Sequence, residues 1–173
     1  MDSCDECGFI YARVSGFDLA AMYRSLVPRL KTLLLAPAAA NLVQVRPATG
    51  VWSALEYTCH LRDVFLVNRE RVYLAMLDDT PTFPSMHPQE RVDFARYNRQ
   101  DPARVAYEFD IATGLLAEAF SGRTSEQLQR LCVYNYPEPT MRTVQWVGRH
   151  TLHEGEHHLL DIKSVLGRLS APA

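Results

Sequence analysis

Residues 143–166, TVQWVGRHTLHEGEHHLLDIKSVL, predict one long amphipathic helix with an unusual polar face. Apolar residues recur along it at helical spacing, at Val144, Val147, Leu152, Leu159, Ile162 and Leu166. Gly167 comes next, and a glycine in this place predicts the end of the helix. Four of the six histidines of the 173-residue chain lie within nine positions of this segment. The apolar face of this helix therefore predicts that other helices pack against it. The four histidines require a separate explanation.

Three further helical patterns supply the neighbours. They span residues 17–35, 53–78 and 101–121, and a shorter one spans residues 90–97. Pro28 lies inside the first and is expected to kink or divide it. Ser53 and Glu56 have the spacing of a capping box, and Asp101-Pro102 is a typical helix start. Proline-rich connectors separate the helices, and no run of alternating strand residues is evident.

This pattern predicts an all-α protein, an up-and-down four-helix bundle with extra short helices. Residues 1–16 are expected to form an N-terminal tail with a C-x-x-C motif, residues 17–167 the single bundle domain, and residues 168–173 a C-terminal tail. A chain of this length buries enough surface to fold without disulfides or metal ions to stabilise it.

Composition argues against several classes of protein. The chain is 47% hydrophobic and 22% charged with a formal net charge of −2, so nothing favours nucleic acid or an anionic membrane surface. The N-terminus lacks the basic region of a signal peptide, and the longest apolar stretch is interrupted by Pro37, so no membrane span is expected. Four cysteines are too few for a disulfide scaffold, and we expect a cytoplasmic protein.

The histidine cluster has the spacing of a metal site. His153 and His157 are one helical turn apart on one face, so two imidazoles can reach one ion. His150 shares that face, and His158 is rotated by about 100° from it. One such pair is a weak motif, and the alternative is a polar helix face of odd composition, but four histidines together favour a metal. A catalytic zinc site usually takes three protein ligands, so one is missing.

The third ligand is sought on another helix. His60, on the helix that Ser53 begins, is better placed than His87, which lies in a proline-rich connector. The surrounding segment, GVWSALEYTCHLRDV at residues 50–64, resembles the first signature of the DinB/YfiT-like family, with a Trp-Ser helix start, a glutamate and a His-Leu pair. HTLHEGEHHLLDI, at residues 150–162, resembles the second signature of that family.

Members of this family are four-helix bundles that hold a divalent metal through one histidine of the second helix and two, four residues apart, of the last. The resemblance thus implies His60, His153 and His157 as metal ligands. The family continues its second signature with Arg-Gly-Gln-Ile, whereas here His158 follows His157 and precedes Leu-Leu-Asp-Ile. If the alignment with the family signature is shifted by one residue, His158 becomes the last ligand. The ligand four residues before it is then Glu154 and not a histidine. We retain His153 and His157, with His158 or His150 as alternatives.

Ligating imidazoles need an acceptor for the second ring N–H. Asp161 lies four residues after His157, and Glu56 lies four before His60, so both are candidates, although the capping box is the stronger explanation for Glu56. Trp52 and Trp146 are expected to pack near the site.

The motif Cys4-Asp-Glu-Cys7 has no obvious partner. A zinc ribbon needs a second cysteine pair, and Cys59 and Cys132 lie on different elements far apart. A redox C-x-x-C normally begins a helix after a strand, which is not predicted here. Half of a metal site shared between subunits and a redox-sensitive tail both remain open, and Cys59 is expected to be a small buried residue.

The resemblance implies a metal-dependent enzyme acting on a small-molecule substrate, a transferase or isomerase that uses a low-molecular-weight thiol such as mycothiol, bacillithiol or glutathione. One alternative is a metal-dependent hydrolase, and another is a non-catalytic bundle that dimerises or binds a partner. Zinc, nickel and iron all suit imidazole ligands. Neither catalytic residues nor residues that bind the thiol are assigned, and a homodimer is left open.

Overall fold

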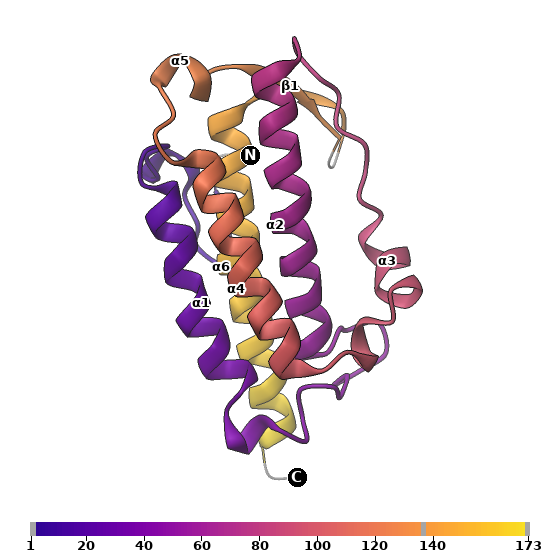
Figure 1. Ribbon diagram of the computed structural model, residues 1–173. Helices are drawn as coiled ribbons and strands as arrows, with labels where there is room; N and C mark the ends of the chain where they lie inside the picture. Colours follow the sequence, from indigo (N-terminus) through magenta and orange to yellow (C-terminus); the bar gives the residue numbers. More distant parts are fainter. Residues whose placement is uncertain (1–2, 136–137, 172–173) are drawn as a thin grey trace.

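Four long helices form the body of the protein. The computed structural model describes residues 3–135 and 138–171 (Figure 1). The long helices are α1 (Leu19–Leu34), α2 (Ala54–Leu77), α4 (Pro102–Phe120) and α6 (Val144–Ser170). The all-α four-helix bundle expected from the sequence is confirmed, and α1 continues through Pro28 as one helix. None of the helices described is both long and apolar enough to cross a membrane.

The helices do not pack in their order along the chain. α1 packs against α4 and α6, and α2 packs against the same two helices. α2 and α4 run in the same direction, because residues 78–101 return along the side of the bundle before α4 begins (Figure 1). The connectivity therefore departs from a simple up-and-down succession, in which each helix lies beside the next one. As a result, α2 and α6 lie side by side although more than sixty residues separate them.

Side-chain caps fix the starts of α2 and α4 as the sequence predicts. The Ser53 hydroxyl accepts a hydrogen bond from the Glu56 backbone N–H (3.2 Å), and the Glu56 carboxylate accepts one from the Ser53 N–H (2.8 Å). Asp101 likewise accepts a bond from the Arg104 N–H (2.7 Å). These caps satisfy backbone donors that the first turn of a helix leaves free, and so they set where each helix begins.

The end of α6 differs from the prediction. The helix continues past Gly167 to Ser170, so the predicted end at Gly167 is wrong. Gly167 does not adopt the positive φ of a helix-terminating glycine, and a glycine inside a helix costs only about 1 kcal/mol. The Ser170 hydroxyl still donates to the Leu166 carbonyl (2.8 Å), which supports the last turn.

A short β-hairpin precedes α6. Its strands are β1 (Leu131–Tyr134) and β2 (Thr140–Thr143), antiparallel, with Leu131 opposite Thr143. No strand was expected here from the sequence, because four residues are too few to show an alternating pattern. The remaining short elements are α3 (Pro88–Phe94), α5 (Ser125–Leu128) and the 3-10 turns η1 (Tyr11–Arg13), η2 (Pro37–Ala39) and η3 (Tyr97–Arg99).

Two glycines let α6 lie close to its neighbours. A Cβ atom on Gly148 would lie 2.5 Å from Leu19 Cδ1 and 2.7 Å from Phe120 Cε1. A Cβ atom on Gly155 would lie 2.5 Å from Leu26 Cδ1. A larger residue at either place would require these side chains to shift, so the two glycines permit the close packing of α6.

The segment before α1 packs on α6. Tyr11 and Val14 are buried, and Arg149 Nε donates to the Val14 carbonyl (2.8 Å). The N-terminal residues expected as a tail therefore form a layer against the last helix over residues 3–16.

Candidate metal centre

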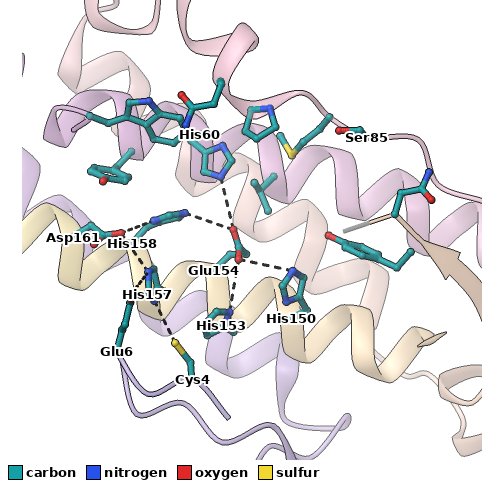
Figure 2. Close-up of a pocket in the computed structure, with 18 of the residues that line it drawn as sticks. Cys4, Glu6, His60, Ser85, His150, His153, Glu154, His157, His158 and Asp161 are labelled. Atoms are coloured by element: carbon teal, nitrogen blue, oxygen red, sulfur yellow. Dashed lines mark hydrogen bonds and ion pairs between the residues drawn. The ribbon is translucent and has the colours of Figure 1, made fainter. Parts of the chain in front are cut away.

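A pocket of about 680 Å³ lies on the bundle where α2 faces α6 (Figure 2). α2 and α6 supply its floor, and the N-terminal segment, the connection after α2 and the end of β1 supply its walls. Its volume is in the range of sites for small molecules. Wall residues include Cys4, Glu6, Ser85, Met86, Pro88 and Tyr134.

Three potential ligands meet at the floor of the pocket, one from α2 and two from α6. Glu154 Oε2 lies 3.8 Å from His60 Nε2 and 3.6 Å from His158 Nε2. One ligand atom of each residue lies within 4.8 Å of the others. Glu154 and His158 are one turn apart, so they project from the same face of α6 toward His60 on the neighbouring helix.

Electrostatics favour an ionised carboxylate in this group. Burial disfavours the charge of Glu154, but interactions with His158 and His60 outweigh burial and hold the carboxyl pKa well below its usual value. Burial also disfavours the charged ring of His158, but Asp161 and Glu154 outweigh it and raise the pKa to about 9. Burial lowers the pKa of His60. Without a metal, the ionised carboxylate of Glu154 thus lies between the charged ring of His158 and the neutral ring of His60.

Glu154 also faces two further histidines of α6. Its Oε1 atom lies 3.7 Å from His153 Nδ1 and 3.9 Å from His150 Nε2. Figure 2 shows the carboxylate surrounded by these imidazoles. His150 forms a 2.9 Å hydrogen bond with the Tyr11 hydroxyl, and burial lowers the pKa of His150 to about 4. His150 is therefore neutral and tied to the N-terminal segment.

His153 and His157 form a second group with the two N-terminal cysteines. One ligand atom from each of Cys4, Cys7, His153 and His157 lies within 4.8 Å of the others. Cys4 Sγ is 3.7 Å from His157 Nδ1. The sequence analysis left these cysteines without partners, and the structure places them against α6.

The structure thus divides the predicted ligands His60, His153 and His157 between two places. In the part of the chain that the structure describes, His60 is grouped with Glu154 and His158. This is the ligand set expected if the alignment with the family signature is shifted by one residue. His153 and His157 are grouped with Cys4 and Cys7, and each also belongs to a further group, His153 with His150 and Glu154, and His157 with His158 and Asp161. Glu154 is the link between the groups, since it faces His60 on one side and His153 on the other.

The two candidate acceptors have different roles. Asp161 Oδ2 accepts a hydrogen bond from His158 Nδ1 (2.8 Å) and lies 3.7 Å from His157 Nε2. The Glu56 carboxylate accepts from the Ser53 N–H and from Arg46, which agrees with its capping role. Among the residues described, His60 Nδ1 has no hydrogen-bond partner.

Aromatic rings surround the centre as expected. The Trp52 ring lies 5.2 Å from the His60 ring, and the Trp146 ring stacks on His150 with centroids 4.8 Å apart. These contacts confirm the prediction that both tryptophans pack near the histidines. Cys59 is fully buried on α2, also as predicted.

Arg71 brings a positive charge to the pocket that the sequence analysis did not consider. The side chain is buried on α2, about three turns beyond His60. It donates to Asn68 Oδ1 (3.0 Å), the Tyr134 hydroxyl (3.3 Å) and the Pro84 carbonyl (2.5 Å). Within residues 3–135 and 138–171, no carboxylate lies at ion-pair distance from it. A buried guanidinium whose partners are neutral is available to an anion.

Glu154 and Arg71 have different signals in the sequence. Glu154 has the i, i+4 relation to His158 that the register shift required, so it was visible as an alternative. Nothing in the sequence marks Arg71 as a pocket residue, because an arginine on a helix is usually exposed. Its importance follows only from the hairpin, which brings Tyr134 over it.

The comparisons agree with this architecture. The model of the DinB superfamily matches residues 19–162. YfiT from Bacillus subtilis, described as a probable metal-dependent hydrolase with an unusual four-helix bundle topology, is 15% identical with a TM-score of 0.80, and the match covers 92% of this chain and 91% of that one. A mutant of the mycothiol-dependent maleylpyruvate isomerase is 10% identical with a TM-score of 0.69, covering 88% and 62%. A search of the curated proteins finds no significant match.

At these identities the two solved structures show a shared fold alone. The family match extends over most of the chain, through α1, α2, α4 and the histidine segment of α6. This chain belongs to the DinB superfamily.

Proposed function

We propose that the chain is a metal-dependent enzyme in which His60, Glu154 and His158 hold one divalent transition-metal ion. The observation that carries the proposal is the meeting of these three side chains on the pocket floor. Two imidazoles and one carboxylate are a known ligand set for catalytic zinc, with a fourth position left open. Zinc, nickel and iron all suit these donors.

The surroundings of the three side chains fit a metal. Asp161 holds His158 Nδ1, which leaves Nε2 directed toward Glu154, and such an acceptor is what a ligating histidine needs. The low pKa of Glu154 keeps its carboxylate available as a ligand. When bound, the ion would act as a Lewis acid and lower the pKa of a water or thiol in the open position.

The set His60, His153 and His157 stays the alternative. It would require His153 and His157 to turn from the cysteine group toward His60. Glu154 distinguishes the two sets, because it is a ligand in the first and not in the second.

Arg71 indicates the class of substrate. It is a buried cation that lines the pocket, and its hydrogen-bond partners are neutral. We infer that the substrate carries an anionic group, such as a carboxylate, which Arg71 would hold while the reacting atom lies nearer to His60.

Two reactions fit such a site. The first is transfer or isomerisation with a low-molecular-weight thiol as co-reactant, supported by the likeness to a mycothiol-dependent isomerase. The second is hydrolysis, supported by the likeness to a probable metal-dependent hydrolase. A hydrolase needs no added thiol, whereas a thiol-dependent enzyme is inactive without one.

The test combines metal analysis with an activity screen on untagged protein. We expect His60→Gln and Glu154→Gln to lose the same equivalent of metal and all activity toward small anionic electrophiles, assayed with and without thiol. Loss of activity in His153→Gln but not in Glu154→Gln would favour the three-histidine set. Protein that binds no metal, even after reconstitution, would overturn the proposal and favour a non-catalytic bundle.

A further inference from the structure

The cysteine group has the composition of a closed zinc site. Cys4 and Cys7 are separated by two residues, and His153 and His157 by three, which are the spacings of Cys₂His₂ zinc sites. The two pairs come from opposite ends of the sequence, yet one ligand atom of each lies within 4.8 Å of the other three. Folding therefore creates this group.

The backbone of the N-terminal segment is shaped to present both thiols. Cys4 N–H donates to the Phe9 carbonyl (2.9 Å), and Gly8 N–H donates to the Cys4 carbonyl (2.8 Å). Gly8 has φ of +70°, a conformation that residues with a side chain rarely adopt. The resulting turn brings Cys4 and Cys7 to one side of the segment, facing α6.

His153 supplies an independent observation. The residue is only 7% exposed, and neither ring nitrogen has a hydrogen-bond partner among the residues described. Its nearest carboxylate oxygen, on Glu154, is 3.7 Å from Nδ1, and the Phe9 and Tyr11 rings cover it. A buried imidazole without a partner costs free energy, which a bond to a metal would recover.

We propose that Cys4, Cys7, His153 and His157 bind a second metal ion, Zn²⁺, with all four positions supplied by the protein. Such a site is structural, because no position is left for water or substrate. It shares no ligand with the adjacent proposed centre at His60, Glu154 and His158, and either proposal can fail alone.

The second ion would clamp the N-terminal segment onto α6. This segment supplies Cys4 and Glu6 to the wall of the pocket, and Glu6 lies 3.4 Å from His157. Zinc would thus fix one wall without taking part in the reaction. The opposing interpretation is a disulfide between Cys4 and Cys7, which would need neither histidine.

The first experiment measures metal content and cobalt spectra of the untagged full-length chain, purified under reducing conditions. We expect two equivalents of zinc in the wild type, one in the double variant Cys4→Ser/Cys7→Ser, and two in the matched control Cys132→Ser. After cobalt substitution, thiolate-to-cobalt absorption should be present in the wild type and in His60→Gln, and absent in the double variant. Absence of this absorption in the wild type, or its persistence in the double variant, would overturn the proposal.

A second experiment separates zinc from a disulfide and does not depend on a variant that folds. Alkylation of the zinc-loaded wild type should spare Cys4 and Cys7 until a chelator is added, because zinc-bound thiolates are protected. Protection that only a reductant removes would establish the disulfide and overturn the zinc site.

The variant Cys4→His replaces one metal ligand by another. It should bind about one equivalent of zinc more than the double variant.

Discussion

Glu154 Oε2 lies 3.6 Å from His158 Nε2, one turn further along α6. If the pair chelates an ion with His60, Glu154→Gln should weaken metal binding by more than the roughly 10- to 100-fold expected for loss of an outer hydrogen-bond partner. Competition with a chromogenic chelator measures the change. Glu156→Gln is the matched control, because Glu156 is on the same helix but pairs with Arg29 outside the pocket (2.7 Å). Equal affinities for both variants would contradict the assignment of Glu154 as a ligand.

Asp161 should influence the same ion indirectly. Its carboxylate accepts from His158 Nδ1 at 2.8 Å and so fixes the ring orientation. We expect Asp161→Asn to lower metal affinity by roughly 10- to 100-fold without abolishing binding. The same chelator competition tests this, and an effect as large as that of Glu154→Gln would mean that Asp161 is itself a ligand.

Arg71 is expected to act on substrate binding. Charge-assisted hydrogen bonds contribute about 1.5–3 kcal/mol, so Arg71→Met should raise KM for an anionic substrate by roughly 10- to 100-fold. Metal content should not change, since Arg71 contacts none of the three proposed ligands. Arg69→Met is the control, because Arg69 is partly exposed on α2, pairs with Glu70 and does not line the pocket. An unchanged KM in Arg71→Met would show that the substrate is not held by its charge.

The metal-free protein should lose stability as the pH rises. The pKa of His158 is about 9 in the folded state against 6.5 for the free side chain, so the stability that its charged form contributes is complete below pH 6.5 and is lost as pH approaches and passes 9. Chemical denaturation with a chelator present, at several pH values in this interval, measures it. His158→Gln should be less stable than the wild type at pH 6.5 and nearly equal above pH 9. A constant difference between the two proteins would show that His158 is not charged in the fold.

The close contact of α6 with its neighbours gives a prediction independent of metal. Gly148→Ala gains up to about 1 kcal/mol of helix propensity, but overpacking against Leu19 and Phe120 costs roughly 1–3 kcal/mol, so we expect net destabilisation. Gly114→Ala is the matched control. Its Cβ would meet nothing within 4 Å on α4, so it should stabilise the protein. Denaturant midpoints compare the two, and a Gly148→Ala protein as stable as wild type would mean that the core adapts to the methyl group.

Local signals made the helices predictable, whereas their connectivity depended on distant contacts. Ser53 and Asp101 mark helix starts through bonds within one turn, so the sequence shows them directly. The parallel course of α2 and α4 depends on the path of residues 78–101, which no periodicity encodes. Gly167 misled the prediction because a single glycine can remain helical at small cost.

The site follows the same division. His60 and the histidines of residues 150–158 were recognisable in the sequence as candidate ligands. The face of α6 that points toward α2 could not be predicted from the sequence. The pairs His153/His157 and Glu154/His158 have identical spacing, offset by one residue. Only the position of α2 beside α6 determines which pair meets His60. The relation of Cys4 to His157 crosses almost the entire chain, so no local pattern could show it.

The connection between α2 and α4 has a consequence for how the protein can evolve. It supplies Ser85, Met86, Pro88 and Gln89 to the pocket, yet it is not one of the four bundle helices. Phe83 and Tyr97 anchor this connection in the core, whereas Ser85 and Gln89 are exposed, and exchanges at exposed loop positions cost little folding free energy. The shape and polarity of the pocket can therefore diverge at these positions while His60, Glu154 and His158 stay in place on their helices.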